Sequence, residues 1–317
     1  MARIHATVLG EIEGVHVAGI VNERGNSAKR LAAAVGTRAF KNLGQALRAT
    51  RADAIFVCLP TPMHRAAVTE AARAGLHVFC EKPMARSVAD AEAMIEVCAK
   101  ENVLLMVGHV LRFFPQYAKL HELVARGDVG KPATARLSRG GAAPKGARNW
   151  YAKRADSGGV LLDLVIHDFD WLLWTFGPVV RAHARQTAPR AGSLASYALA
   201  VLRHESGVIS HVEGFWGHEL AFRTRVDVAG DKGALEYDSL HPVAVELHRA
   251  GPSSARPGVV LPESPLARGP FRLEDEHFID CVRRRAAPDP SAGDALRALR
   301  VSLACLASAR TGEVVCP

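Results

Sequence analysis

Apolar and polar positions along the first 126 residues follow two alternating periods. Short apolar or β-branched runs predict strands at 15–21, 37–40, 53–59, 77–80 and 103–107. Segments with helical spacing separate them, at 1–9, 27–35, 43–49, 63–74, from Ser87 onward, and 115–126. Strands that alternate with helices imply right-handed crossovers and a parallel, doubly wound sheet. Ligands of such sheets bind at the carboxyl ends of the strands, and the polar residues there are Asn22, Thr61, Glu81, Lys82 and His109.

The pattern changes after Gly130, where strands follow one another without helices between them. The predicted strands are 133–140, 179–186, 197–203, 208–215, 224–229, 234–237 and 243–248. Turn signals at 205–207 and 230–233 predict antiparallel hairpins. Residues 250–270, rich in Pro, Gly and Ser, are expected to form a loop, and helices at 273–285 and 292–311 follow. We therefore expect an α/β domain followed by an α+β domain with a mainly antiparallel open sheet.

Residues 157–177 form the one long apolar stretch of this second part, and polar residues interrupt it. Ser157 and two glycines predict a helix start, and Gly177 a helix end. Asp163 and His167 are four residues apart, so one continuous helix would place them on one face. A carboxylate and an imidazole among apolar residues are costly unless they are partnered or used. The pair is therefore either a structural brace of a buried helix or part of an active site.

A metal site that joins Asp170 to this pair is a weaker alternative. Asp170 follows His167 by three residues and lies near the same helical face. No second cluster of His or Cys supports a metal centre. We expect no metal.

Composition limits the classes of partner. At 317 residues the chain is long enough for two domains with ample core. The net charge is +8, but the 40 Lys and Arg are scattered among 32 acids, and only 6% of residues are aromatic. This is not the footprint of a nucleic-acid-binding protein. The chain has no apolar run of membrane-spanning length, no apolar signal core at its start and no Cys-x-x-Cys motif. We expect a cytoplasmic protein that binds neither nucleic acid nor membrane.

Four motifs together carry a resemblance to a known family. They are Pro60-Thr61-Pro62-Met63-His64, Cys80-Glu81-Lys82-Pro83, Gly108-His109-Val110-Leu111-Arg112-Phe113, and Gly158-Gly159-x3-Asp163-x3-His167. In this order and spacing the chain resembles the Gfo/Idh/MocA oxidoreductases, typified by glucose–fructose oxidoreductase and inositol dehydrogenase. The resemblance extends from residue 1 to the last predicted helix.

The resemblance implies a division of the chain at residue 112. Residues 1–112 would form a Rossmann-type domain that binds NAD or NADP. Residues 113–317 would bind the substrate and build a homodimer or homotetramer through the sheet, with the C-terminal helices packing back toward the first domain. The substrate would be a sugar, an inositol or a related polyol.

The resemblance also implies roles for individual residues. The family's catalytic lysine matches Lys82, its substrate-orienting aspartate Asp163 and its base histidine His167. The residues expected along the cofactor are Asn22, Arg24, Pro60, Thr61, Pro62, His64, Glu81 and Lys82. Elementary chemistry agrees, because a histidine with a pKa near 6.5 suits removal of a hydroxyl proton at neutral pH. A lysine ammonium can stabilise charge on the substrate oxygen, and Asp163 can fix a neighbouring hydroxyl.

Three further residues are candidates for contact with substrate. His109 and Arg112 follow a strand end, and Tyr151 precedes the long apolar stretch. A packing or capping role is equally open for His109, a structural salt bridge for Arg112, and core packing for Tyr151.

The chain departs from the family pattern at its start. Family members begin with a strand and a G-x-G-x-x-G turn, whereas this chain starts inside the helix that follows them. Two hypotheses account for this: a start codon assigned too far downstream, or genuine loss of the strand. The second would give a ligand-binding protein with impaired cofactor binding. A glycoside-cleaving enzyme that uses NAD is a further alternative.

The residues after the strand ending at Val21 bear on cofactor choice. The strand normally delivers an acidic residue to the adenosine ribose, but this chain has Asn22, followed by Glu23 and Arg24. A neutral residue and a nearby arginine would accommodate a 2′-phosphate, which favours NADP slightly. Glu23 could still serve the ribose of NAD.

Overall fold

The computed structural model describes residues 1–22, 25–144, 150–151, 153–187, 196–217, 221–241, 245–249, 258–259 and 268–317. The chain forms two compact units. The first unit comprises residues 1–85, 89–110 and 268–293, and the second comprises 86–88, 111–267 and 294–317. The sequence places residues 268–293 in the second domain, whereas the structure groups them with the first unit. The reason is that the helix they contain packs against the N-terminal helix.

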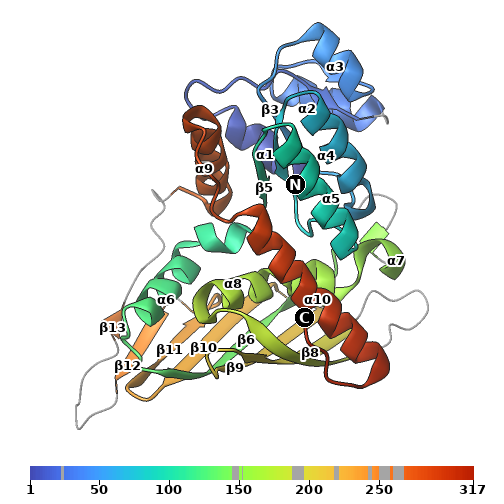
Figure 1. Ribbon diagram of the computed structural model, residues 1–317. Coiled ribbons are helices and arrows are strands. Elements are labelled where there is room, and N and C mark those ends of the chain that lie inside the picture. The colour runs from blue at the N-terminus through green and yellow to red at the C-terminus, as the bar shows by residue number, and fades with distance from the viewer. Residues whose placement is uncertain are drawn as a thin grey trace. The chain divides into compact units, whose positions relative to one another are not determined.

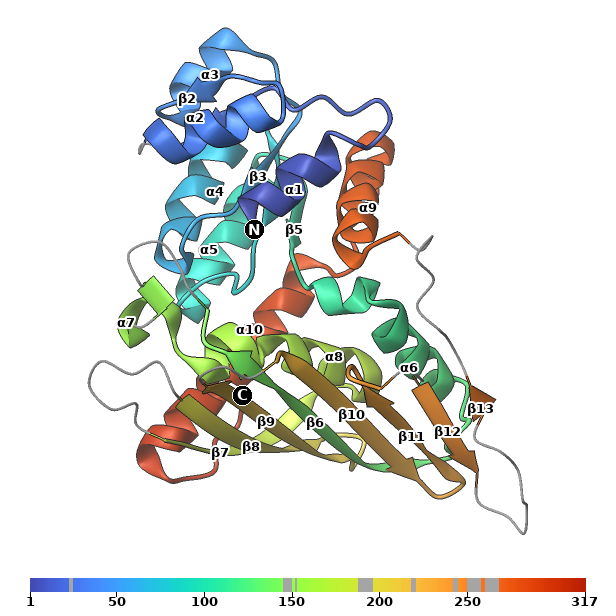
Figure 2. The same cartoon turned by 180° about the vertical axis from the view of Figure 1, so that it is seen from behind.

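The first unit consists of helices around short parallel strands. Its helices are α1 (Ala2–Leu9), α2 (Gly25–Ala34), α3 (Leu43–Ala49), α4 (His64–Arg73), α5 (Val88–Lys100) and α9 (Pro270–Arg284). Its strands are β1 (Ile20–Val21), β2 (Ala39–Phe40), β3 (Ala54–Val57), β4 (His77–Cys80) and β5 (Leu105–Val107). Every residue of β4 and β5 is buried, as expected for parallel strands covered on both faces. Figure 2 shows α1 on one side of these strands, with α4 and α5 on the other.

The parallel strands form two separate sheets. One contains β1 and β2, and the other has the order β3-β4-β5. The carbonyls of Asp53 and Val57 accept hydrogen bonds from β4 and from Glu81, so one edge of β3 is paired. No strand among the described residues pairs with its other edge. This agrees with the prediction of a Rossmann-type sheet that lacks its first strand. The run 15–21 contributes only two strand residues, because its single partner β2 is equally short.

The second unit is built on one large sheet. Its strands are β6 (Pro132–Ala142), β7 (Val179–Gln186), β8 (Ser196–His204), β9 (Ile209–Gly217), β10 (Arg223–Gly230), β11 (Gly233–Asp238), β12 (Val245–Arg249) and β13 (Gly258–Val259). Their order is β13-β12-β11-β10-β6-β9-β8-β7. All neighbours are antiparallel except β6 and β9, which are parallel. The predicted hairpins at 205–207 and 230–233 are confirmed. The strand β13 lies inside the segment predicted as a loop; the rest of 250–267 is outside the described residues.

Helices cover one face of this sheet. They include α6 (Pro115–Ala125) and α8 (Ile166–Phe176), which lie over the same side in Figures 1 and 2. Side chains alternate accordingly along β8, where Ala198, Ala200 and Leu202 are buried while Tyr197 and Leu199 are exposed. Two more helices complete the unit, α7 (Arg154–Ser157) and α10 (Ala292–Thr311). In the described part of the chain, no helix is both long and apolar enough to cross a membrane.

Candidate active site

The carboxyl ends of β3, β4 and β5 lie at one edge of the first unit's sheet. The parallel register pairs Val57 with Cys80 and Cys80 with Val107. The residues that follow these strands therefore leave the sheet side by side. They are the Pro60–Pro62 turn, Glu81 with Lys82, and Gly108 with His109. The sequence predicted this grouping with Asn22 as a further member; the register agrees for the segments after β3, β4 and β5, whereas Asn22 follows β1 of the separate two-stranded sheet.

Glu81 is held at both carboxylate oxygens. Oε1 lies 3.0 Å from Nε2 of His5, and Oε2 accepts the backbone N–H of Lys82 at 3.1 Å. Burial acts to raise the pKa of Glu81, but the hydrogen bond and charge of His5 outweigh it and leave this pKa below its usual range. Glu81 is therefore an ionised, fixed group beneath Lys82, which is half-buried.

His5 joins Glu81 to the last helix of the first unit. Its Nδ1 lies 2.8 Å from Oδ1 of Asp275 in α9. Burial acts to lower the pKa of His5, but hydrogen bonds to Asp275 and Glu81 raise it to about 9. Sequence reasoning missed both His5 and Asp275. The available signal was a histidine on the same helical face as the buried residues Ala6 and Leu9.

The Pro60–His64 segment braces the neighbouring turn. Thr61–Met63 form one turn of 3₁₀ helix before α4. The His64 ring lies between carbonyls: Nε2 is 2.8 Å from the oxygen of Leu59, and Nδ1 is 3.0 Å from that of Pro83. Burial lowers the pKa of His64, although the hydrogen bonds to these carbonyls act to raise it. Its observed role is to connect the ends of β3 and β4; its contact with a cofactor stays a prediction.

Two predicted cofactor residues follow β1. Asn22 is half-buried, and its side-chain amide lies 3.5 Å from the hydroxyl of Ser27, at the limit of a hydrogen bond. Arg24 lies outside the described residues, so the structure does not address its predicted role.

The stretch 157–177 is not the single helix that the sequence predicts. It consists of the end of α7, a π-helical turn at Val160–Leu164, and α8 from Ile166. Gly158 and Gly159 separate the first two pieces with φ of 79° and 70°, which residues with a side chain rarely adopt. Two adjacent glycines with positive φ cannot continue an α-helix, so α7 ends before them and the helical segment begins at Val160, directly after the predicted start signal.

The π turn holds Asp163, and His167 lies in the first turn of α8. The N–H of Val165 bonds the carbonyl of Val160, a spacing of five residues. The rule that residues four apart in an α-helix share a face therefore does not apply directly to this pair. Asp163 is buried and His167 is half-buried. π turns inside helices recur at functional sites, so the presence of one at Val160–Leu164 favours a functional role for this segment.

The next two acidic residues of the stretch are in structural ion pairs. Asp168 accepts two hydrogen bonds from Arg139, at 2.8 and 2.9 Å, and Arg139 also donates to the hydroxyl of Tyr117. Asp170 accepts two from Arg112, at 2.9 and 2.7 Å. The proposed metal ligand Asp170 is thus occupied by an arginine. Among the described residues, no group of three His, Cys, Asp or Glu is arranged to hold a metal ion.

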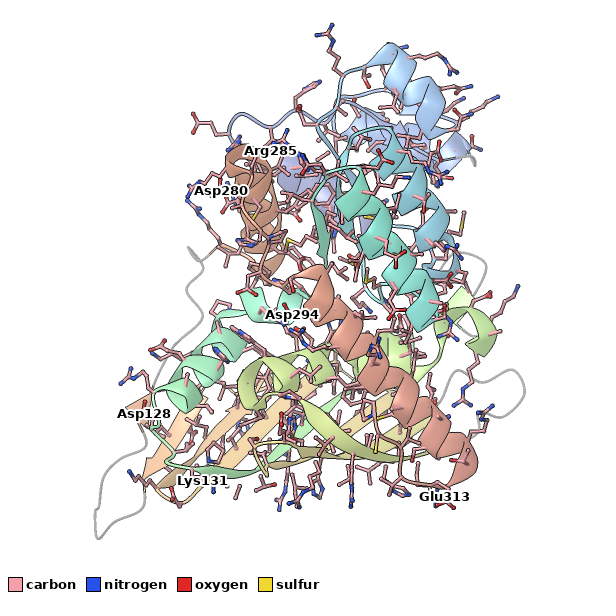
Figure 3. All side chains as sticks on the ribbon, viewed as in Figure 1. Asp128, Lys131, Asp280, Arg285, Asp294 and Glu313 are labelled. Atoms are coloured by element: carbon pink, nitrogen blue, oxygen red, sulfur yellow. The ribbon has the colours of Figure 1, made fainter. Side chains whose placement is uncertain are left out.

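The three candidate substrate residues have different surroundings. Arg112 is 5% exposed; besides Asp170 it lies 3.5 Å from Asp294 in the first turn of α10, labelled in Figure 3. Its guanidinium also lies 5.3 Å from the centre of the Trp174 ring. These contacts agree with the alternative of a structural salt bridge. His109 is fully buried, and the Tyr151 ring lies 4.1 Å from that of Trp150. Their contact with substrate stays a prediction.

Thr61, Glu81 and Lys82 stand at strand ends, where ligands of open parallel sheets bind. Their contact with a nicotinamide cofactor stays a prediction. At Gly108 an added Cβ would lie 3.1 Å from the Phe79 ring, so only a glycine fits there without displacing that ring.

Comparison with known proteins agrees with this geometry. Residues 1–109 match the oxidoreductase family with an NAD-binding Rossmann fold, and residues 117–236 match the GFO/IDH/MocA C-terminal domain. Fold and family match thus define a nicotinamide-dependent oxidoreductase. With both domains matched, the chain belongs to the Gfo/Idh/MocA family.

Two curated relatives and one solved structure illustrate the range of similar proteins. Myo-inositol 2-dehydrogenase of Thermotoga maritima is 31% identical over 252 residues, which cover 77% of this chain and 74% of the relative. D-apiose dehydrogenase of Paraburkholderia graminis is 29% identical over 331 residues, 99% of this chain and 86% of the relative. The structure of aldose-aldose oxidoreductase from Caulobacter crescentus, complexed with glycerol, is 27% identical, with a TM-score of 0.86; the match covers 99% of this chain and 96% of that one.

Proposed function

We propose that this NAD(P)-dependent oxidoreductase oxidises a secondary alcohol of a sugar, inositol or related polyol, or reduces the matching ketone. The observation that carries the proposal is the π turn at Val160–Leu164, which holds Asp163 just before His167 in a chain of a nicotinamide-dependent family. The relatives support the substrate class, since their names include an inositol dehydrogenase and a dehydrogenase of the sugar apiose.

In this proposal His167 transfers the hydroxyl proton. An imidazole has a pKa close to neutral pH, so it accepts a proton during oxidation and returns one during reduction. Asp163 accepts a hydrogen bond from a neighbouring hydroxyl and fixes the face of the substrate that reacts. When bound, the nicotinamide ring accepts or returns the hydride.

Lys82 stabilises the substrate oxygen. Its ammonium donates a hydrogen bond to that oxygen, whose negative charge grows as the proton leaves. The Glu81 carboxylate, which accepts the backbone N–H of Lys82, places a negative charge next to this residue in the chain.

The test is product analysis of His167→Asn and Lys82→Met beside the unchanged protein. Each is incubated with NAD⁺ or NADP⁺ and a panel of polyols, aldoses and aryl glycosides. Formation of a keto product by the unchanged protein, with a strong loss in both variants, supports the proposal. Release of the aryl alcohol without net cofactor reduction would instead indicate glycoside cleavage. Tight binding of a polyol with no turnover would indicate a ligand-binding protein.

NADP is the proposed preferred cofactor. The support is the neutral Asn22 at the end of β1, where an acidic residue would repel a 2′-phosphate. A ratio of kcat/KM that favours NADP⁺ over NAD⁺ supports this preference. The variant Asn22→Asp is then expected to shift the ratio toward NAD⁺, and an unchanged ratio would contradict the assignment.

We also propose that two copies of the chain associate through the outer face of the large sheet. Tyr197 and Leu199 of β8 and Ile209 of β9 are exposed on this face, between 37% and 39%. Tyr197 and Leu199 are neighbours on this face of β8, where the register pairs Tyr197 with Phe215, whereas Ile209 lies farther along the sheet, opposite Arg203. Large apolar side chains exposed on this face favour an interface. Sedimentation of Leu199→Glu is expected to shift the protein toward a monomer.

A further inference from the structure

His5, Glu81 and Asp275 form a buried charged cluster in the first unit. The two His5 nitrogens lie 3.0 Å from Glu81 Oε1 and 2.8 Å from Asp275 Oδ1. The His5 and Asp275 side chains are 1% and 0% exposed. The three residues come from α1, the end of β4 and α9, so 270 positions separate His5 from Asp275 along the chain. The proposed chemistry assigns no task to His5 or Asp275.

The geometry favours a protonated histidine. A neutral imidazole can donate from one nitrogen only, but both His5 nitrogens face carboxylate oxygens. Aromatic rings surround the cluster: the ring centres of Phe79 and Phe56 lie 5.1 and 5.4 Å from that of His5. They exclude water, and in such surroundings charge-assisted hydrogen bonds are strong and directional.

The cluster continues to the backbone of Lys82. Glu81 binds His5 through Oε1 and accepts the Lys82 N–H at Oε2. A carboxylate held by one oxygen alone could turn about its side-chain bonds, whereas one held at both oxygens cannot. The orientation of the peptide between Glu81 and Lys82 is therefore set by the group that holds Oε1.

We propose that His5 is a positioning residue that fixes the Glu81–Lys82 peptide, and with it the direction in which the Lys82 side chain leaves the strand. Asp275 completes the device, because it binds the second nitrogen and fixes the plane of the imidazolium. The proposal rests on the role of Lys82 proposed above. His5 itself touches neither substrate nor cofactor in this scheme.

Loss of the proton from His5 should remove one of its two hydrogen bonds and so weaken the positioning of the Glu81–Lys82 peptide. The groups that face His5 are Asp275 from α9 and Glu81 from the end of β4; farther out, the Lys82 ammonium and the Met1 amino group also act on Glu81. The two carboxylates raise the pKa of His5 to about 9, so the positioning should persist at neutral pH and weaken in base.

The test combines amide hydrogen exchange with kinetics on three variants of the full chain. His5→Gln removes the imidazolium, and Asp275→Asn removes the carboxylate that binds its second nitrogen. His77→Gln is the matched control: it is another buried histidine of the same unit, at the opposite end of β4, where it accepts a hydrogen bond from the N–H of Leu104. The readouts are the exchange rate of the Lys82 amide, the kcat and KM for myo-inositol with NAD⁺ or NADP⁺, and their pH profiles.

Positioning predicts a specific combination of results. The Lys82 amide exchanges at least tenfold faster in His5→Gln and Asp275→Asn than in His77→Gln. Over the same comparison kcat falls at least tenfold, with a smaller change in KM for myo-inositol. The unchanged protein is expected to lose kcat near pH 9, and His5→Gln is expected to show no such loss. A lower melting temperature with unchanged Lys82 exchange and unchanged kcat would overturn the proposal.

The exchange measurement separates this proposal from the proposed function. If Lys82→Met keeps full activity, the catalytic role of Lys82 fails. The Lys82 amide would still report whether His5 fixes the peptide, because that readout needs no turnover. If His5→Gln does not fold, Asp275→Asn decides by the same comparison.

Discussion

Nδ1 of His5 and Oδ1 of Asp275 lie 2.8 Å apart, at the point where the first and ninth helices pack together. This contact joins the first and last segments of the first unit and is part of a buried charged cluster. Buried charges of this kind make stability depend on pH, since the folded state binds a proton that the unfolded state releases.

The first prediction concerns this pH dependence. The pKa of His5 is about 9 in the folded protein and near 6.5 when unfolded. Its stabilising contribution is therefore complete below pH 6.5 and is lost as pH rises through 9, by up to about 3 kcal/mol. Burial disfavours the charged form of Asp275 and raises its pKa, so the titration of Asp275 affects stability only at lower pH. Urea unfolding between pH 6 and 10 measures the effect; an equally steep decline in His5→Gln would show that other groups cause it.

The second prediction concerns the pair of Arg139 and Asp168. Both side chains are at most 5% exposed, and burial, which lowers the pKa of Arg139, is outweighed by the Asp168 carboxylate, which raises it. Asp168→Asn leaves the guanidinium without its charge partner, so we expect a loss of about 3–5 kcal/mol in the free energy of unfolding. The control is Asp90→Asn, which breaks the exposed pair with Arg65 and should cost less than about 1 kcal/mol. Equal losses in denaturant titrations would refute the assignment of Arg139–Asp168 as a core ion pair.

The third prediction concerns the packing of the π turn. A Cβ on Gly214 of β9 would lie 2.4 Å from a methyl of Val165 and 2.6 Å from one of Val160. Gly214→Ala should therefore displace the turn, destabilise the protein by about 1–3 kcal/mol and reduce kcat, because Asp163 moves with the turn. In the matched control Gly44→Ala, the nearest atom would be 3.5 Å away, and we expect no loss of kcat. Normal kcat in Gly214→Ala would show that the turn's position is not critical.

The fourth prediction concerns the proton-transfer residue. His167→Asn should lower kcat by about 10²–10⁴, the usual contribution of a general acid–base group. The dissociation constant for NADH, measured by its fluorescence, should change little, since His167 is assigned to the substrate and lies in the second unit. A histidine that only braces the helix would instead lower the melting temperature and leave kcat nearly unchanged.

The sequence predicts the site's local features better than its long-range contacts. The end of β4 is evident because an apolar run stops at Glu81, and the hairpin at 205–207 is evident from its turn residues. The parallel pairing of β6 with β9 is not evident from the sequence, because the two strands are far apart in the chain and nothing in their residues indicates how they pair. The π turn is missed for another reason: the apolar pattern of Val160–Leu164 is equally compatible with an α-helix.

The partners of individual charged residues are also hidden in the sequence. The sequence does not distinguish Asp168 from Asp170. In the structure they bind different arginines, Arg139 and Arg112, which lie 29 and 58 residues away along the chain. The same holds for His5, whose position in a short amphipathic helix gives no indication of Asp275.

The most direct test of the central claim is isotope transfer. Myo-inositol deuterated at its reacting carbon is incubated with NAD⁺ or NADP⁺ and the protein, and the reduced cofactor is examined by mass spectrometry and NMR. The account predicts deuterium at C4 of the nicotinamide ring, and loss of that transfer in His167→Asn and Lys82→Met. Oxidised myo-inositol without deuterium in the cofactor, or full transfer in both variants, would contradict it.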